Sequence, residues 1–163
     1  ICCEIYSLFL LTVFMTLKQK IYNHYLQLVN NKVNMLQTIL ADLKESGSNE
    51  TKSTAGDKHE TALAMLQIEQ ANTRTQLEEV LLQKAALEKI NPLVSATTIR
   101  NGSLVKTNRG YLFVCIALGK AEIEAVEIIA LSPQSPLGQK LIGLAVTDVV
   151  EINNNKYVIE SIL

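Results

Sequence analysis

Two long stretches without glycine or proline flank one short polar stretch, and this arrangement limits the folds open to the chain. Neither residue type occurs in residues 1–46 or in residues 57–91, whereas the polar stretch between them contains Gly47 and Gly56. Glycine and proline are the strongest helix breakers, so two uninterrupted runs joined by a short glycine-containing loop predict a helical hairpin. We place the hairpin at residues 15–91 and its tip loop at residues 46–57.

Size and composition fit an ordinary folded protein of one domain or two small ones. The chain has 163 residues, of which 48% are hydrophobic and 19% are charged, and its formal net charge is −1. Wholesale disorder and bulk electrostatic binding to nucleic acid are therefore disfavoured. The three cysteines include no CxxC pair, so a structural zinc site and a disulfide framework are not expected and a reducing compartment fits best.

Residues 1–14 are nearly all apolar and are treated separately from the hairpin. The run is shorter than the roughly 20 residues of a membrane span, and it lacks the basic start and cleavage site of a signal peptide. We expect translation to begin at Met15, with a membrane anchor as the alternative. A membrane partner is thus not expected.

Apolar residues recur at spacings of three and four along both predicted helices, which places them on one face of each helix. In the first helix these positions are Ile21, Tyr25, Leu28, Met35, Leu36, Ile39, Leu40 and Leu43. In the second they are Leu63, Leu66, Leu77, Val80 and Leu87, with Gln70, Thr73 and Lys84 between them. We interpret this interface (the seam) as a weak, partly polar coiled coil in a hairpin that serves for reach, with dimerisation along it as the alternative.

The pattern changes at Pro92 to short β-type runs, and we place a second domain at residues 92–163. Turns are expected at residues 108–110, 119–120 and 153–155, with a short helix after residue 135. The predicted fold class is α+β: an antiparallel helical hairpin followed by a small antiparallel sheet with one short helix. No nucleophile–base pair or phosphate loop is evident, and Cys115 is interpreted as a core residue.

Two motifs resemble those of the bacterial Gre transcript-cleavage factors. The stretch SPQSPLGQKLIGLAVTDVVEI is similar to the family's C-terminal signature, and residues 56–60, GDKHE, resemble its Gly-Asp-x-x-Glu tip motif. The resemblance covers residues 15–163 and implies an FKBP-like C-terminal domain. The family's usual tip continues with further acidic and aromatic residues, which this chain lacks. The resemblance therefore favours polymerase binding more strongly than efficient cleavage.

The resemblance implies a cytoplasmic factor that binds bacterial RNA polymerase and inserts its hairpin into the secondary channel. Asp57 and Glu60 would help hold a second Mg²⁺, shared with the polymerase active site, while the factor has no cofactor of its own. The polymerase, rather than the factor, would then cleave the backtracked RNA. Ser135, Pro136, Leu137 and Gly138 would lie at the polymerase contact. Lys52 and Lys58 are candidate contacts to phosphates of the nascent RNA 3′ end.

Physical reasoning permits the metal role but leaves alternatives. Asp57 and Glu60 are three residues apart and would share one side of a first helical turn, where acidic residues also favour the helix dipole without any metal. Alternative functions are a secondary-channel regulator or inhibitor without cleavage activity, a peptidyl-prolyl isomerase, and a membrane-tethered coiled-coil scaffold. The isomerase is disfavoured because Tyr111, Phe113 and Tyr157 are few aromatics for a proline pocket.

Overall fold

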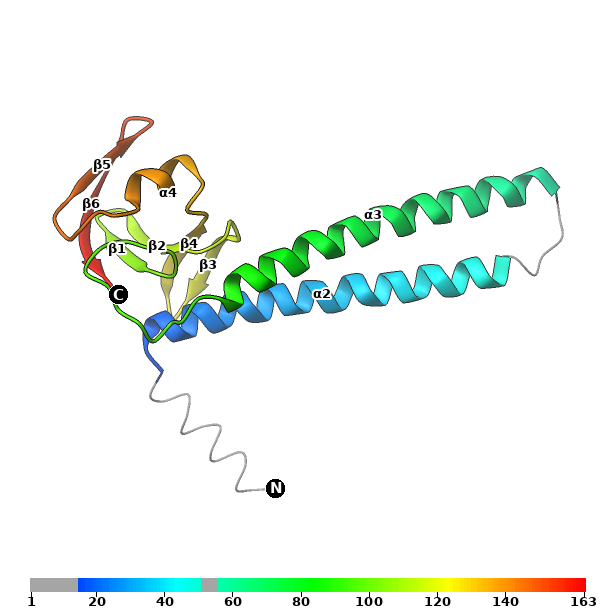
Figure 1. The fold of residues 1–163 in the computed structure, drawn as a ribbon, viewed down its shortest axis with the longest axis horizontal. Helices are drawn as coiled ribbons and strands as arrows, with labels where there is room; N and C mark the ends of the chain where they lie inside the picture. The colour runs from blue at the N-terminus through cyan, green and yellow to red at the C-terminus, as the bar shows by residue number, and fades with distance from the viewer. Residues whose placement is uncertain (1–14, 51–55) are drawn as a thin grey trace, which may run out of the picture. The chain divides into compact units, whose positions relative to one another are not determined.

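Two long helices precede a six-stranded sheet and one short helix, which confirms the predicted α+β class (Figure 1). The computed structural model describes residues 15–50 and 56–163, and the side chains of residues 15–48 and 61–163. The helices are α2 (Leu17–Glu50), α3 (Gly56–Glu88) and α4 (Pro136–Leu141). The strands are β1 (Leu104–Thr107), β2 (Gly110–Val114), β3 (Gly119–Ile123), β4 (Val126–Leu131), β5 (Val149–Ile152) and β6 (Asn155–Ile162).

The chain divides into two compact units, and the division does not fall at Pro92. One unit is Leu26–Ala85, and the other contains Ala86–Leu163 together with the chain up to Tyr25. The sheet-containing unit therefore takes in the first turns of α2 and the last turn of α3. The reason is packing, since Lys20 of α2 bonds to Glu124 in the turn between β3 and β4, and Tyr25 of α2 bonds to Gly119 of β3.

The buried side of α2 differs from the predicted one. Val29, Val33, Leu36 and Leu40 are buried, whereas the side chains of Leu28 and Met35 are 42% and 54% exposed. Tyr25 is fully buried, and steps of four residues from it lead to Val29 and Val33 rather than to Leu28 and Met35. The prediction was therefore wrong at Leu28 and Met35.

The predicted seam of α3 is confirmed, because each of its positions is buried or partly buried. Polar members of the seam find hydrogen bonds: Gln70 Nε2 donates to the Leu43 carbonyl at 3.1 Å, and Thr73 Oγ1 donates to the Glu69 carbonyl at 2.8 Å. A buried polar group without such a partner would be costly. The polar positions are thus compatible with a two-helix interface.

The loop at the tip is shorter than the predicted range of residues 46–57. Helix α2 continues through Gly47 to Glu50, and α3 already begins at Gly56. An interior glycine costs a helix only about 1 kcal/mol relative to alanine, so Gly47 does not end α2. Residue 57 therefore lies in a helix and not in the loop.

The sheet has the strand order β3-β4-β2-β1-β6-β5 and is mostly antiparallel. One pair departs from the expected antiparallel arrangement, because β2 and β4 run parallel. The predicted turn at residues 119–120 was wrong, since both residues belong to β3. The turn lies at Glu124 and Ala125, whose φ angles are 53° and 60°, and it returns the chain into β4 beside β2.

The core of this unit lies between the sheet and α4. It consists of Ile99, Val105, Leu112, Val114, Leu131, Leu141, Val150 and Ile159. Phe113 points to the opposite face, where Tyr25 stacks on it with ring centroids 6.2 Å apart. Burial of one such large side chain contributes about 1.5–3 kcal/mol. Both faces of the central strands are therefore covered.

In the parts of the chain that the structure describes, no helix combines the length and apolarity needed to cross a membrane.

Candidate functional site

The predicted tip motif lies at the start of α3. This helix begins at Gly56, so Asp57, Lys58 and Glu60 occupy its first turn. Their side chains, and Lys52 as a whole, lie outside the described residues. Positions three apart in a helix share one side, so the backbone places residues 57 and 60 on the same side of the turn.

Two carboxylates in the first turn of a helix have the chemistry to contribute ligands to a metal ion. The first turn of a helix favours negative charge, because its backbone N–H groups and dipole point toward the N-terminus. Mg²⁺ takes one or two protein carboxylates and fills the rest of its octahedral shell with water or with substrate phosphates. Two carboxylates on one side of a helical turn are thus chemically compatible with such an ion, and the sequence prediction of a Mg²⁺ role for Asp57 and Glu60 stays a prediction. Among the described residues, no group of three or more His, Cys, Asp or Glu could hold a metal ion.

A groove of about 470 Å³ lies between the helices close to the tip. It is lined by Lys44, Gly47, Ser48, Leu63, Leu66, Gln67 and Gln70. The hydroxyl of Ser48 donates to the Lys44 carbonyl at 3.0 Å. Sequence reasoning recognised Leu63, Leu66 and Gln70 only as seam positions and did not anticipate the groove. The small residues Gly47 and Ser48, at the end of α2, were the available signal.

The four candidate polymerase-binding residues build the turn into α4. Ser135 caps the helix: its Oγ accepts from Gly138 N at 3.0 Å and donates to the Ser132 carbonyl at 2.7 Å. Pro136 is the first residue of α4, where its missing N–H costs nothing. Leu137 packs against the core. The local structure alone thus explains why these residue types occur in the turn. A polymerase contact would use the same turn.

Gly138 is required by a close approach of two backbone segments. A Cβ at this position would lie 2.1 Å from the Ser132 carbonyl oxygen, closer than real Cβ atoms come to any neighbour. Gly138 is buried, whereas Pro136 is exposed together with Gln139 and Lys140. A partner would therefore meet Pro136, Gln139 and Lys140, of which sequence reasoning named only the first.

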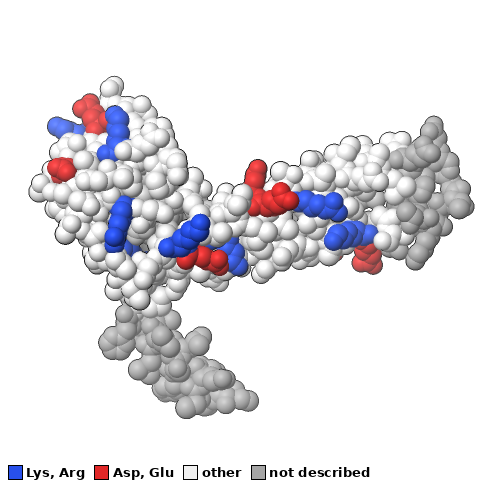
Figure 2. Space-filling view, viewed as in Figure 1, with Lys and Arg blue, Asp and Glu red and all other residues white. Residues whose placement is uncertain are grey.

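The predicted site residues belong to two different compact units. The tip belongs to the unit Leu26–Ala85, and α4 belongs to the sheet-containing unit. Figure 2 shows acidic and basic side chains interspersed rather than gathered into a one-signed patch in this view. Three exposed pairs illustrate the mixing: Lys20–Glu124 and Lys120–Glu127 at 2.5 Å, and Lys106–Glu160 at 3.0 Å.

Cys115 is a core residue, as predicted. Its side chain is 3% exposed, and burial raises the pKa of the thiol to about 12. A nucleophilic cysteine needs a lowered pKa and some access to solvent. Cys115 therefore contributes packing rather than covalent chemistry.

Comparison with protein-family models and with curated proteins finds no match to this sequence.

Proposed function

We propose that this protein is an accessory factor of bacterial RNA polymerase that stimulates cleavage of backtracked RNA. The observation that carries the proposal is the start of α3 at Gly56, which puts Asp57 and Glu60 on one side of a first helical turn. This pair stands at the end of a hairpin whose two helices run for 34 and 33 residues. The resemblance of both the tip and the C-terminal signature to Gre factors supplies the partner.

In this mechanism the hairpin enters the secondary channel and carries the two carboxylates to the polymerase active site. Asp57 and Glu60 would help hold a Mg²⁺ there, and such an ion would supply stabilisation of the negative charge on the phosphodiester oxygens during cleavage. Asp57 and Glu60 would each contribute carboxylate oxygens, and the dipole of α3 favours negative charge in the first turn, where both residues lie. The factor alone is not an enzyme.

The C-terminal domain would hold the factor on the polymerase. The surface around the α4 turn presents Pro136, Gln139 and Lys140 to solvent, while Ser135 and Gly138 keep the turn in place. Lys52 and Lys58, with Lys44 in the groove, would contact RNA phosphates as point charges.

One alternative loses support from the packing of the sheet. A peptidyl-prolyl isomerase needs an open pocket with aromatic walls. Phe113 is fully buried and Tyr25 stacks on it, so this ring cannot line an open pocket without displacing α2. A channel regulator without cleavage activity remains the alternative, and the experiment below distinguishes it.

The test is RNA cleavage in stalled, backtracked elongation complexes of the cognate polymerase in Mg²⁺ buffer. We expect Asp57→Asn with Glu60→Gln to reduce the stimulated cleavage rate about 100-fold, because removal of one group that stabilises the transition-state charge costs about that much. The matched control is Asp42→Asn with Glu45→Gln, two exposed carboxylates with the same spacing on α2, which should cleave like the wild type.

Polymerase binding is measured in parallel with cleavage. Binding without cleavage by the wild-type protein would contradict the proposal and support a channel regulator. Absence of both would exclude either role in the secondary channel.

A further inference from the structure

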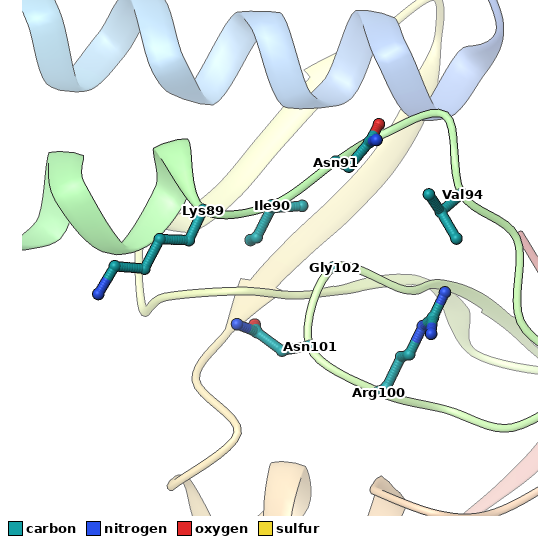
Figure 3. Close-up of a pocket in the computed structure, with 7 residues that line it drawn as sticks. All are labelled: Lys89, Ile90, Asn91, Val94, Arg100, Asn101 and Gly102. Carbon is teal, nitrogen blue, oxygen red and sulfur yellow. The ribbon is translucent and has the colours of Figure 1, made fainter.

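An open hollow at the end of α3 is bordered by positive charge (Figure 3). Its volume is about 310 Å³, within the size range of small-ligand sites. It is lined by Lys89, Ile90, Asn91, Val94, Arg100, Asn101 and Gly102. All of these residues belong to the sheet-containing unit, and none of them is acidic.

The backbone around the hollow is held by defined contacts. Ile90 N donates to the Leu87 carbonyl at 3.0 Å as α3 ends, and the side-chain oxygen of Asn91 accepts from Leu93 N at 3.0 Å. Gly102 has a φ of +88°, and a Cβ there would lie 2.7 Å from Cγ2 of Ile90. Glycine at position 102 therefore allows the loop before β1 to approach the end of α3 closely and to line the hollow.

The two cations of the hollow lie on opposite sides of Gly102, as Figure 3 shows. Among the described residues, neither Lys89 nor Arg100 has a carboxylate partner. The guanidinium of Arg100 has one long contact, 3.5 Å to the Ser95 carbonyl. Most of its donors thus remain available to a ligand.

A third cation, Lys18, bonds to the backbone of a residue that lines the hollow. Lys18 is only 6% exposed, and its ammonium donates to the carbonyl of Val94 at 2.8 Å. Burial and the charge of Arg100 lower the pKa of Lys18, so these two groups lie close enough to repel each other. An anion bound beside Arg100 would relieve that repulsion.

We propose that this hollow binds a phosphate-bearing ligand. Arg100 presents the planar fork of donors that matches phosphate oxygens, and the amide of Asn101 can add another donor. Lys89 adds a second positive charge at the edge of the hollow, with its ammonium directed away from Gly102 in Figure 3, while Val94 offers apolar surface to the organic part of the ligand. This site is separate from the tip, and the inference does not depend on the proposed function.

The test uses the full chain and titrates it with three probes: inorganic pyrophosphate, AMP and a single-stranded RNA octamer. Binding is followed by the backbone and side-chain amide NMR signals of residues 89–102 at fixed ionic strength. We expect at least one probe to shift these signals saturably and Arg100→Gln to weaken its binding about tenfold or more. Lys89→Gln should weaken binding less, because Lys89 acts as a single point charge.

The charge-matched control is Arg109→Gln, which removes a cation that stacks on Tyr157 at 5.7 Å. It should leave affinity within about twofold, allowing for the long-range effect of one charge. Binding of pyrophosphate or AMP would identify a small phosphate compound, and binding of the octamer alone would identify a phosphodiester chain. No saturable shift with any probe, or equal weakening by Arg100→Gln and Arg109→Gln, would overturn the proposal.

Discussion

Thr147 has a φ of 80°, in a region of backbone conformation that β-branched residues avoid. The surrounding hydrogen bonds hold it there: Thr147 N donates to the Ile159 carbonyl at 2.9 Å, and Asp148 Oδ2 accepts from Ala145 N at 2.8 Å. The Thr147 side chain is exposed, so it gains little packing in return. The strain is therefore a local cost that the tight turn before β5 imposes on this residue.

We expect Thr147→Gly to raise the free energy of unfolding by about 1 kcal/mol. Glycine adopts positive φ without strain, and this gain exceeds its greater loss of backbone entropy on folding. Thr97→Gly is the control, because Thr97 is exposed and does not have a positive φ; it should be neutral or destabilising. Urea unfolding of both variants measures the difference, and a destabilised Thr147→Gly would contradict the assignment of strain.

Two glycines lie within helices, but the space around them differs. Gly47 lies inside α2, and the nearest atom to an added Cβ is the Gln70 side-chain nitrogen at 3.7 Å, an ordinary contact distance. Gly138 lies inside α4, where an added Cβ would collide with the backbone at Ser132. Position in a helix therefore does not decide the effect of a substitution, whereas the surrounding space does.

We expect Gly47→Ala to stabilise the protein by about 0.5–1 kcal/mol, because alanine is the better helix former. Gly138→Ala should destabilise it by more than about 2 kcal/mol, since backbone must move to relieve the clash. The pair serves as its own control, and denaturant unfolding with circular dichroism measures both. Equal effects of the same sign would show that helix propensity alone governs the two positions.

The elements with strong local signals were predictable from the sequence. The short helix expected after residue 135 is α4, which begins at Pro136. The closing hairpin was also predicted, and its turn residues Asn153 and Asn154 both have positive φ, which asparagine tolerates better than most residues. Local conformational preference was sufficient in these cases.

Features set by tertiary contacts were not predictable. Leu28 and Val29 are adjacent and both apolar, so periodicity alone did not show which one faces the seam; Val29 continues the row of the anchored Tyr25. The parallel pairing of β2 with β4 depends on strand order rather than on local pattern. The spacing of residues 57 and 60 was enough to place them on one helical turn. The hollow at Arg100, by contrast, is formed by two separate segments, and the sequence contains no motif that indicates it.

Across the sheet-containing unit, Tyr25 links two parts of the chain that are far apart in sequence. Its hydroxyl donates to the carbonyl of Gly119 at 3.2 Å, and its ring stacks on Phe113. Burial and the neighbouring Cys115 raise the pKa of Tyr25 from 10.0 to about 12, while burial raises the pKa of the Cys115 thiol from 9.0 to about 12. Both groups thus resist ionisation only while this unit is folded.

This unit should therefore lose stability in alkaline solution. Well below pH 9 both groups are protonated in the folded and unfolded states; as pH rises, the unfolded chain releases these protons first, and the free energy of unfolding falls until about pH 12. We expect the fall to begin near pH 9 through Cys115 and to steepen above pH 10 through Tyr25. Tyr25→Phe should cost about 1 kcal/mol at pH 8, because it loses a hydrogen bond, and should show a shallower fall above pH 10. Adding Cys115→Ala should make the fall shallower still, and the remainder should include Tyr22, whose pKa is raised by burial and by Glu88. Urea unfolding from pH 8 to 11 measures these slopes, and parallel curves for the wild type and Tyr25→Phe would show that Tyr25 ionises equally in both states.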